Sequence, residues 1–232
     1  SSVNEGSNIN LTLKLAFEPS ANTAITITIP SNTGISFASG SFSGTYSNTF
    51  TTGNWNSGFT IPVYGLEDVN TIAENITITA SAGGSPTDVT LGISSVDNDI
   101  QEISIPATLS LVEGNNSSIL VKLLFDPVSP LTITLTLASS SGISFNSGIS
   151  VLSTTVSMTT ANYSGGVSLN IYALEDSNIA SENVTLTASA SGVTNKILTV
   201  TSVDNDTQSF VFTSATSSVG EGNSIDLNLK LA

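Results

Sequence analysis

The sequence predicts an all-β protein made of tandem antiparallel β-sandwiches, and three observations support this prediction. First, apolar and polar residues alternate along short segments, as in residues 9–15, where Asn10, Thr12 and Lys14 separate aliphatic side chains. Second, many of these apolar residues are β-branched, and clusters of Gly, Pro, Asn and Ser separate the segments, as is typical of strands and turns. Third, the chain repeats itself with a period near 108 residues, which suits an array of small domains. About seven short strands in each repeat indicate an immunoglobulin-like sandwich.

The individual strands follow from the same alternation. After the first segment, a period of two recurs in residues 24–29, 59–63, 76–80, 108–112, 131–137, 167–171, 184–188 and 197–203. No stretch of ten or more residues shows the apolar spacing of a helix face. We therefore expect short strands joined by turns.

Recurrent motifs set the expected domain boundaries. A Glu-Gly pair at 5–6 returns at 113–114 and again at 221–222, Leu-Glu-Asp at 66–68 returns at 174–176, and Asp-Asn-Asp at 97–99 returns at 204–206. We expect a repeat at 1–99 that lacks its first strand, a complete repeat at 100–206, and the opening strands of a third repeat at 207–232. The first repeat would then have an open sheet edge, with which residues 207–216 of a neighbouring copy could pair. A frayed tail without a partner is the alternative.

Charge and composition exclude several functions. The formal net charge is −14, with four lysines and no arginine. Contacts to phosphates need a basic face, so we expect no nucleic-acid partner. No apolar run approaches the roughly 18 residues of a spanning helix, so we expect no membrane insertion. The chain has neither cysteine nor histidine, which excludes disulfides, zinc sites and Cys–His or Ser–His–Asp catalysis. We expect a protein that is not an enzyme.

The acidic residues are concentrated in the recurrent motifs. Thirteen of the eighteen lie there, in expected turns whose loops can converge at one end of a sandwich. Six carboxylates in one small volume repel one another unless a cation lies among them. A ligand set of oxygens alone favours calcium over transition metals, and magnesium tolerates irregular loop sites poorly. The alternative is that these acids only cap turns through hydrogen bonds from side chain to backbone.

The order of these motifs resembles the Calx-beta repeat. Glu-Gly opens the repeat, an acidic hairpin ending in Glu-Asn follows, and Asp-x-Asp closes it. That family has an immunoglobulin-like sandwich and occurs in sodium–calcium exchangers and many bacterial surface proteins; the resemblance covers nearly the whole chain. Leu66 and Leu174 stand where the strongest binders have an acid, so we expect fewer ions per domain and weaker binding. The resemblance implies calcium as the cofactor, with metal ligands Glu5, Glu67, Asp68, Glu74, Asp97 and Asp99 in the first repeat and Glu113, Glu175, Asp176, Glu182, Asp204 and Asp206 in the second.

Together these features favour a structural or adhesive repeat segment of an extracellular surface protein or filament, in which calcium stiffens the domain ends. Its partners would be neighbouring repeats of the same protein, including head-to-tail copies, and a surface ligand that the sequence does not identify. Two other functions stay open. One is a module that binds a glycan or a protein through its loops or a sheet face, and the other is a filament subunit that assembles by strand exchange.

Overall fold

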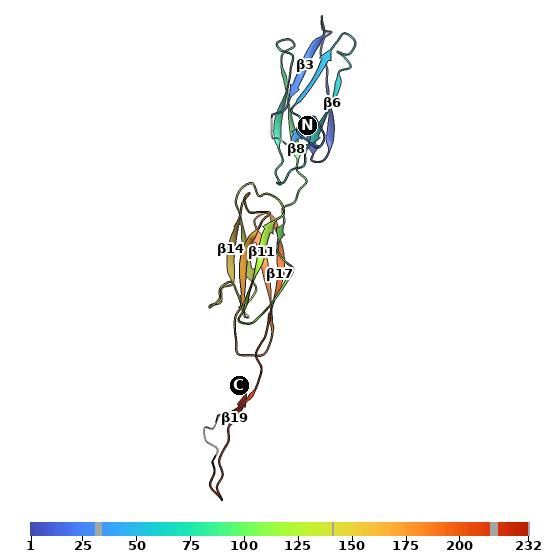
Figure 1. Cartoon of the computed structure of the whole chain (residues 1–232). Coiled ribbons are helices and arrows are strands. Elements are labelled where there is room, and N and C mark those ends of the chain that lie inside the picture. Colours follow the sequence, from blue (N-terminus) through green and yellow to red (C-terminus); the bar gives the residue numbers. More distant parts are fainter. Residues whose placement is uncertain (31–33, 141, 214–217, 232) are drawn as a thin grey trace. The chain divides into compact units, whose positions relative to one another are not determined.

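The protein is all-β, as the sequence predicts. The computed structural model describes residues 1–30, 34–140, 142–213 and 218–231, and these residues form strands, turns and loops (Figure 1). They divide into two compact units, one of Ser1–Gln101 with Phe125–Val128 and the other of Glu102–Leu124 with Ser129–Ala232. Within the described ranges there is no helix long and apolar enough to cross a membrane.

The first unit is a sandwich of two sheets. One sheet has the order β1-β8-β7-β3-β5 and the other the order β2-β6-β4. The two-residue strand β4 raises the number of elements above the seven expected, but it adds little to the sheet. The strands are β1 (Ser2–Asn4), β2 (Asn8–Leu13), β3 (Thr23–Thr28), β4 (Ile35–Ser36), β5 (Thr45–Phe50), β6 (Phe59–Gly65), β7 (Asn75–Ser81) and β8 (Val89–Val96).

The second unit repeats this plan and adds one short strand. Its sheets have the orders β10-β17-β16-β12-β14 and β13-β15-β11-β9, so that β11 is flanked on both sides. The strands are β9 (Ile103–Ser104), β10 (Thr108–Val112), β11 (Asn116–Leu123), β12 (Leu131–Leu137), β13 (Ile143–Ser144), β14 (Ser153–Met158), β15 (Val167–Ala173), β16 (Glu182–Ala190) and β17 (Val193–Val203).

One strand pair in each unit is parallel, and the other strand pairs between described residues are antiparallel, as predicted for the sandwiches. Val3 lies opposite Ser95 in the pair β1–β8, and Leu111 lies opposite Ser202 in the pair β10–β17. The reason is that the chain changes sheets after β1 and after β10. Both strands lie beside the last strand of their unit, whereas the strands that follow them, β2 and β11, belong to the facing sheet. The Glu-Gly motif marks the crossing, which brings it to the end of the sandwich.

Each unit has its own apolar core, built by the predicted alternation. Along β12, Ile133, Leu135 and Leu137 are buried, and the threonines between them are less buried or exposed. In the first unit, Ile25 and Ile27 on β3 point into the core in the same way. The period of two in the sequence therefore corresponds to one buried face per strand.

One further pair of strands lies in the C-terminal residues, where the sequence predicts the opening strands of a third repeat. β18 (Phe210–Phe212) and β19 (Leu229–Leu231) are antiparallel, with Phe210 opposite Leu231, and all six residues are exposed. Of the segments 207–216 and 207–232 considered above, residues 214–217 and 232 lie outside the described residues.

Candidate metal centre

The Glu-Gly motif is fixed at the end of each sandwich by backbone hydrogen bonds. The Glu5 N–H donates to the Val96 carbonyl at 3.1 Å, and the Gly6 N–H donates to the Gly65 carbonyl at 3.1 Å. The motif is thereby held between the end of β8 and the end of β6. These are the points from which the Asp-Asn-Asp motif and the acidic hairpin begin, so the sequence motifs meet at one place.

The glutamate of this motif is buried without a hydrogen-bond partner. Glu5 is 3% exposed and Glu113 is 1% exposed. In each of them both carboxylate oxygens are buried, and no hydrogen bond to another described residue reaches them. An ionised carboxylate in such a position costs several kcal/mol unless it is paired or coordinates a metal. The side chain therefore lacks the partner that its burial requires.

Four further carboxylates surround Glu5. Its oxygen lies with those of Asp68 and Glu74 in one group, and with those of Asp97 and Asp99 in another, all within 4.8 Å of one another in each group. Glu5 belongs to both groups and links them. Like charges at this separation cannot all be ionised at low cost without a cation among them.

The second unit has the same arrangement around Glu113. One group adds Asp176 and Glu182 and the other adds Asp204 and Asp206, again within 4.8 Å. The two acidic sites are formed by two copies of the same sequence motif. Their agreement indicates that the clustering follows from the motif spacing.

Turn-capping hydrogen bonds orient the aspartates but occupy only one of their oxygens. Asp97 Oδ1 accepts from the Asp99 N–H at 2.7 Å, whereas Asp97 Oδ2 is buried and unpartnered among the described residues. Glu74 Oε2 is buried and unpartnered in the same sense. The capping interpretation thus explains one oxygen of Asp97 and leaves the other available for a cation.

An asparagine that the sequence interpretation did not consider holds the acidic hairpin. Asp68 Oδ1 accepts from both the backbone N–H and the side-chain Nδ2 of Asn70, each at 2.7 Å. Asp176 and Asn178 repeat this pair at 2.7 and 2.6 Å. The signal was present in the sequence, because an Asp followed two residues later by Asn is typical of an Asx turn.

Glu67 and Glu175 differ from the other predicted ligands. The structure does not place them in either group of its unit. Instead each lies over the glycine of the Glu-Gly motif: a Cβ at Gly6 would overlap Glu67 Oε1, and one at Gly114 would overlap Glu175 Oε1. Both glycines also have positive φ, of +66° and +72°. The presence of glycine at this position in both repeats therefore has two physical reasons.

Clustering and burial raise the pKa values of several of these acids. Burial, followed by the charges of Asp68 and Asp97, raises the pKa of Glu5 from 4.5 to about 7. Burial and the charge of Asp176 raise the pKa of Glu113, and burial and the charge of Asp68 raise that of Glu74. Desolvation and the charge of Asp97 raise the pKa of Asp99. Each cause is one that a bound cation would offset.

Comparisons with known proteins find only distant similarity. No protein-family model matches the chain, and no curated protein matches it. A structure of S-layer protein SbsC domains 4 and 5 has 12% identity and a TM-score of 0.32, over 61% of this chain and 69% of that chain. An I-band fragment of titin has 12% identity and a TM-score of 0.35, over 89% of this chain and 62% of that one.

A third similar structure, the extracellular cadherin domains 1–5 of protocadherin gamma B2, has 13% identity and a TM-score of 0.35, over 83% of this chain. The chain spans 34% of the length of that structure. Similarity at this level assigns neither a family nor a function. The Calx-beta resemblance therefore stays a prediction that rests on the motifs.

Proposed function

We propose that this chain is a non-enzymatic structural segment of an extracellular surface protein, and that calcium bound at the acidic end of each sandwich stabilises it. One observation carries the proposal. In both units a glutamate that is almost fully buried and has no hydrogen-bond partner among the described residues lies among four other acids. A cation is the partner that removes both the desolvation cost and the mutual repulsion.

The ligand chemistry selects the cation. Every candidate ligand is a carboxylate, and the chain has no histidine or cysteine to offer nitrogen or sulfur. Hard oxygen donors suit calcium and magnesium, but magnesium requires near-ideal octahedral geometry. The acids here come from three separate turns, two of which are capped by aspartate side chains, at Asp68 and at Asp97. Such a loop-built set fits the flexible coordination of calcium better.

The connectivity indicates how a bound cation would act on the fold. Glu5 lies where β1 passes to β2, Asp68 and Glu74 lie between β6 and β7, and Asp97 and Asp99 follow β8. A cation held by these residues would tie together the first crossing, the hairpin and the last strand of the unit. The site would then close the end of the sandwich and resist its fraying.

The extracellular location follows from the calcium requirement of the proposal. Sites of this kind in extracellular modules have Kd values of about 10⁻⁴ to 10⁻³ M, which suit the calcium level outside cells. In a titration that reaches a hundredfold excess of calcium over Kd, binding to one site would stabilise the fold by about 2.7 kcal/mol, and at calcium levels near Kd by about 0.4 kcal/mol. A repeat segment with such sites would be stiff where calcium is abundant, as an adhesive stalk requires.

Thermal unfolding in excess EGTA and across a calcium titration tests this function. We expect a saturable rise of the melting temperature that magnesium does not reproduce at the same concentration. An identical melting temperature in EGTA and in saturating calcium would reject the proposal. A rise that magnesium reproduces in full would reject the assignment to calcium.

A further inference from the structure

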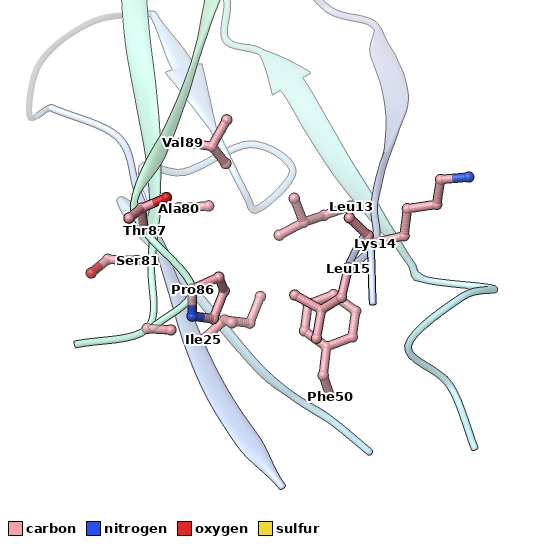
Figure 2. Close-up of a pocket in the computed structure, with 12 residues that line it drawn as sticks. Leu13, Lys14, Leu15, Ile25, Phe50, Ala80, Ser81, Pro86, Thr87 and Val89 are labelled. Carbon is pink, nitrogen blue, oxygen red and sulfur yellow. The ribbon is translucent and has the colours of Figure 1, made fainter. Parts of the chain in front are cut away.

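The first unit contains an apolar groove between its two sheets. One part, of about 280 Å³, is lined by Leu13, Leu15, Phe50, Ala80 and Val89 among others. In Figure 2, Leu13 and Leu15 lie across an open space from Ala80 and Val89. An adjoining part of about 230 Å³ shares Leu13, Ala80 and Val89. Lys14 lies at the rim, with its amine directed away from the other side chains (Figure 2). The unit is thus open to solvent where a sandwich is usually closed.

In the second unit a short segment fills the corresponding place. β9 pairs with the end of β11, with Ile103 opposite Leu123 and Ser104 opposite Lys122. Ile103 is 1% exposed and Ile105 is 9% exposed, and both belong to the core. In the first unit, β2 is the counterpart of β11, but it forms the edge of its sheet and pairs with no described strand on that side.

Matched positions show what a segment equivalent to β9 would cover in the first unit. The N–H of Leu15 donates to the Trp55 carbonyl at 3.0 Å, as that of Leu123 donates to the Tyr163 carbonyl at 3.0 Å, which fixes the equivalence. Leu91 on β8 is 41% exposed, whereas its counterpart Leu198 on β17 is fully buried. The inward side chains of β2 and of the residues just after it are only half-buried, namely Leu11, Leu13 and Leu15. Their counterparts Ile119, Val121 and Leu123 are buried.

The chain carries a second copy of the filling segment, and that copy is exposed. Residues 101–105 read QEISI and residues 208–212 read QSFVF, each starting two residues after the Asp-Asn-Asp motif. Phe210 and Phe212 therefore take the positions of Ile103 and Ile105. They are 73% and 65% exposed. Phe210 lies opposite Leu231 in β18–β19, in the register that Ile103 has with Leu123.

We propose that β18 of one copy inserts into the groove of the first unit of a second copy. In this arrangement Phe210 lies opposite Leu15 and Val211 opposite Lys14, so that Phe210 and Phe212 face the groove. The edge of β2 supplies the free backbone groups for strand addition. β18 would separate from β19, against which it buries little surface, and would pack inside the sandwich of the second copy. Because donor and acceptor are different surfaces, the contact is head-to-tail and builds chains or rings.

Sedimentation velocity of the 232-residue protein over a range of concentrations tests this proposal. We expect a concentration-dependent series of oligomers in calcium and in EGTA alike, because no acidic ligand lines the groove. The melting experiment on calcium can therefore fail without affecting this result, and the reverse also holds. A protein that stays monomeric at every concentration would overturn the proposal.

Three variants distinguish strand insertion from nonspecific association. The donor variant Phe210→Asp/Phe212→Asp and the acceptor variant Leu91→Lys should each weaken self-association at least about tenfold, which is about 1.4 kcal/mol. All three side chains are substantially exposed in the monomer, so the fold should persist, and circular dichroism checks this. Leu229→Asp/Leu231→Asp changes the other strand of the exposed pair and should leave association intact. An equal loss in that variant would overturn the proposal.

A mixing experiment tests the head-to-tail geometry. The donor variant keeps an intact groove and the acceptor variant keeps an intact β18, so a mixture of the two should form a heterodimer and no longer species. A synthetic peptide of residues 207–213 should bind the donor variant and raise its melting temperature, whereas the same peptide with both phenylalanines changed to aspartate should not. Absence of both the heterodimer and peptide binding would contradict insertion into the groove.

Discussion

The backbone N–H of Asp206 donates a 2.8 Å hydrogen bond to Oδ1 of Asp204, while Oδ2 of Asp204 is buried and has no partner among the described residues. Asp97 and Asp99 show the same relationship in the first unit. The two closing aspartates of each repeat thus form a capped turn and still present an unsatisfied oxygen to the buried glutamate beside them. This combination is the basis for the predictions on the acidic sites.

Changing the closing aspartates should remove the calcium response of one unit only. For Asp204→Asn/Asp206→Asn we expect the second unit to lose its calcium-dependent rise in melting temperature, because two of the charged ligands become neutral. Differential scanning calorimetry with and without EGTA measures this. Asp97→Asn/Asp99→Asn is the matched variant and should affect only the first unit. A full calcium response in the variant carrying all four changes would refute the assigned sites.

Neutralising the buried glutamate should stabilise the metal-free protein. Glu113 is 1% exposed and unpartnered within the described part of the chain, so Glu113→Gln removes a desolvated charge and keeps the volume. We expect a higher melting temperature in EGTA at pH 8 and a lost response to calcium in the second unit. Glu18→Gln, which changes an exposed acid outside both sites, should do neither. A lower melting temperature of Glu113→Gln in EGTA would contradict a repulsive site.

The metal-free protein should lose stability as the pH rises from about 4.5 to about 7. Glu5 has a pKa near 7 in the folded protein against an ordinary value of 4.5, so the folded form binds the proton more tightly, and its advantage disappears as the pH passes the folded pKa. The expected effect is a decrease in the free energy of unfolding across this range. Urea unfolding in EGTA across this pH range measures it.

Saturating calcium should reverse this dependence, because the ion binds the deprotonated acids. Stability in calcium should therefore rise over the same pH range. If the curves in calcium and in EGTA run parallel, the acids do not exchange protons for the ion.

Substitution of the glycine of the Glu-Gly motif should cost stability mainly through its backbone angle and should displace the glutamate that lies over it. Gly114→Ala must accommodate a Cβ that overlaps Glu175 Oε1 at a φ of +72°, whereas Gly192 has a φ of +75° and open space around its Cβ position. Strain at positive φ costs about 1–2 kcal/mol in either variant. Because Glu175 is exposed and Oε1 is the far end of a flexible side chain, it can move aside, so we expect Gly114→Ala and Gly192→Ala to lose similar stability in chemical unfolding. A much larger loss in Gly114→Ala would show that Glu175 is held in place.

The fold was predictable from the sequence where one local signal decides it. Alternation along residues 131–137 predicts the strand β12 and its buried face, and the structure confirms both. The parallel pairing of β1 and β10 was not predictable, because alternation reports which face is buried and not the direction of the neighbouring strand. That direction depends on the change of sheet at the Glu-Gly motif, which is a property of the whole sandwich.

The acidic sites were predictable as a group but not residue by residue. Recurrence of the motifs at turns indicated that all six acids of each repeat lie together, and the structure brings five of them into the two groups of each unit. Glu67 and Asp68 are adjacent in the sequence, yet the chain directs Asp68 into the group and Glu67 over Gly6. Neighbouring residues on an extended segment point to opposite sides, and the motif alone does not say which side faces the site.

Isothermal titration of calcium into the metal-free protein measures binding at the two acidic sites. We predict saturable binding in both units, with the binding capacity halved in Glu113→Gln and abolished in Glu5→Gln/Glu113→Gln. No heat of binding at millimolar calcium, or unchanged binding in the double variant, would contradict a calcium site built around the two buried glutamates.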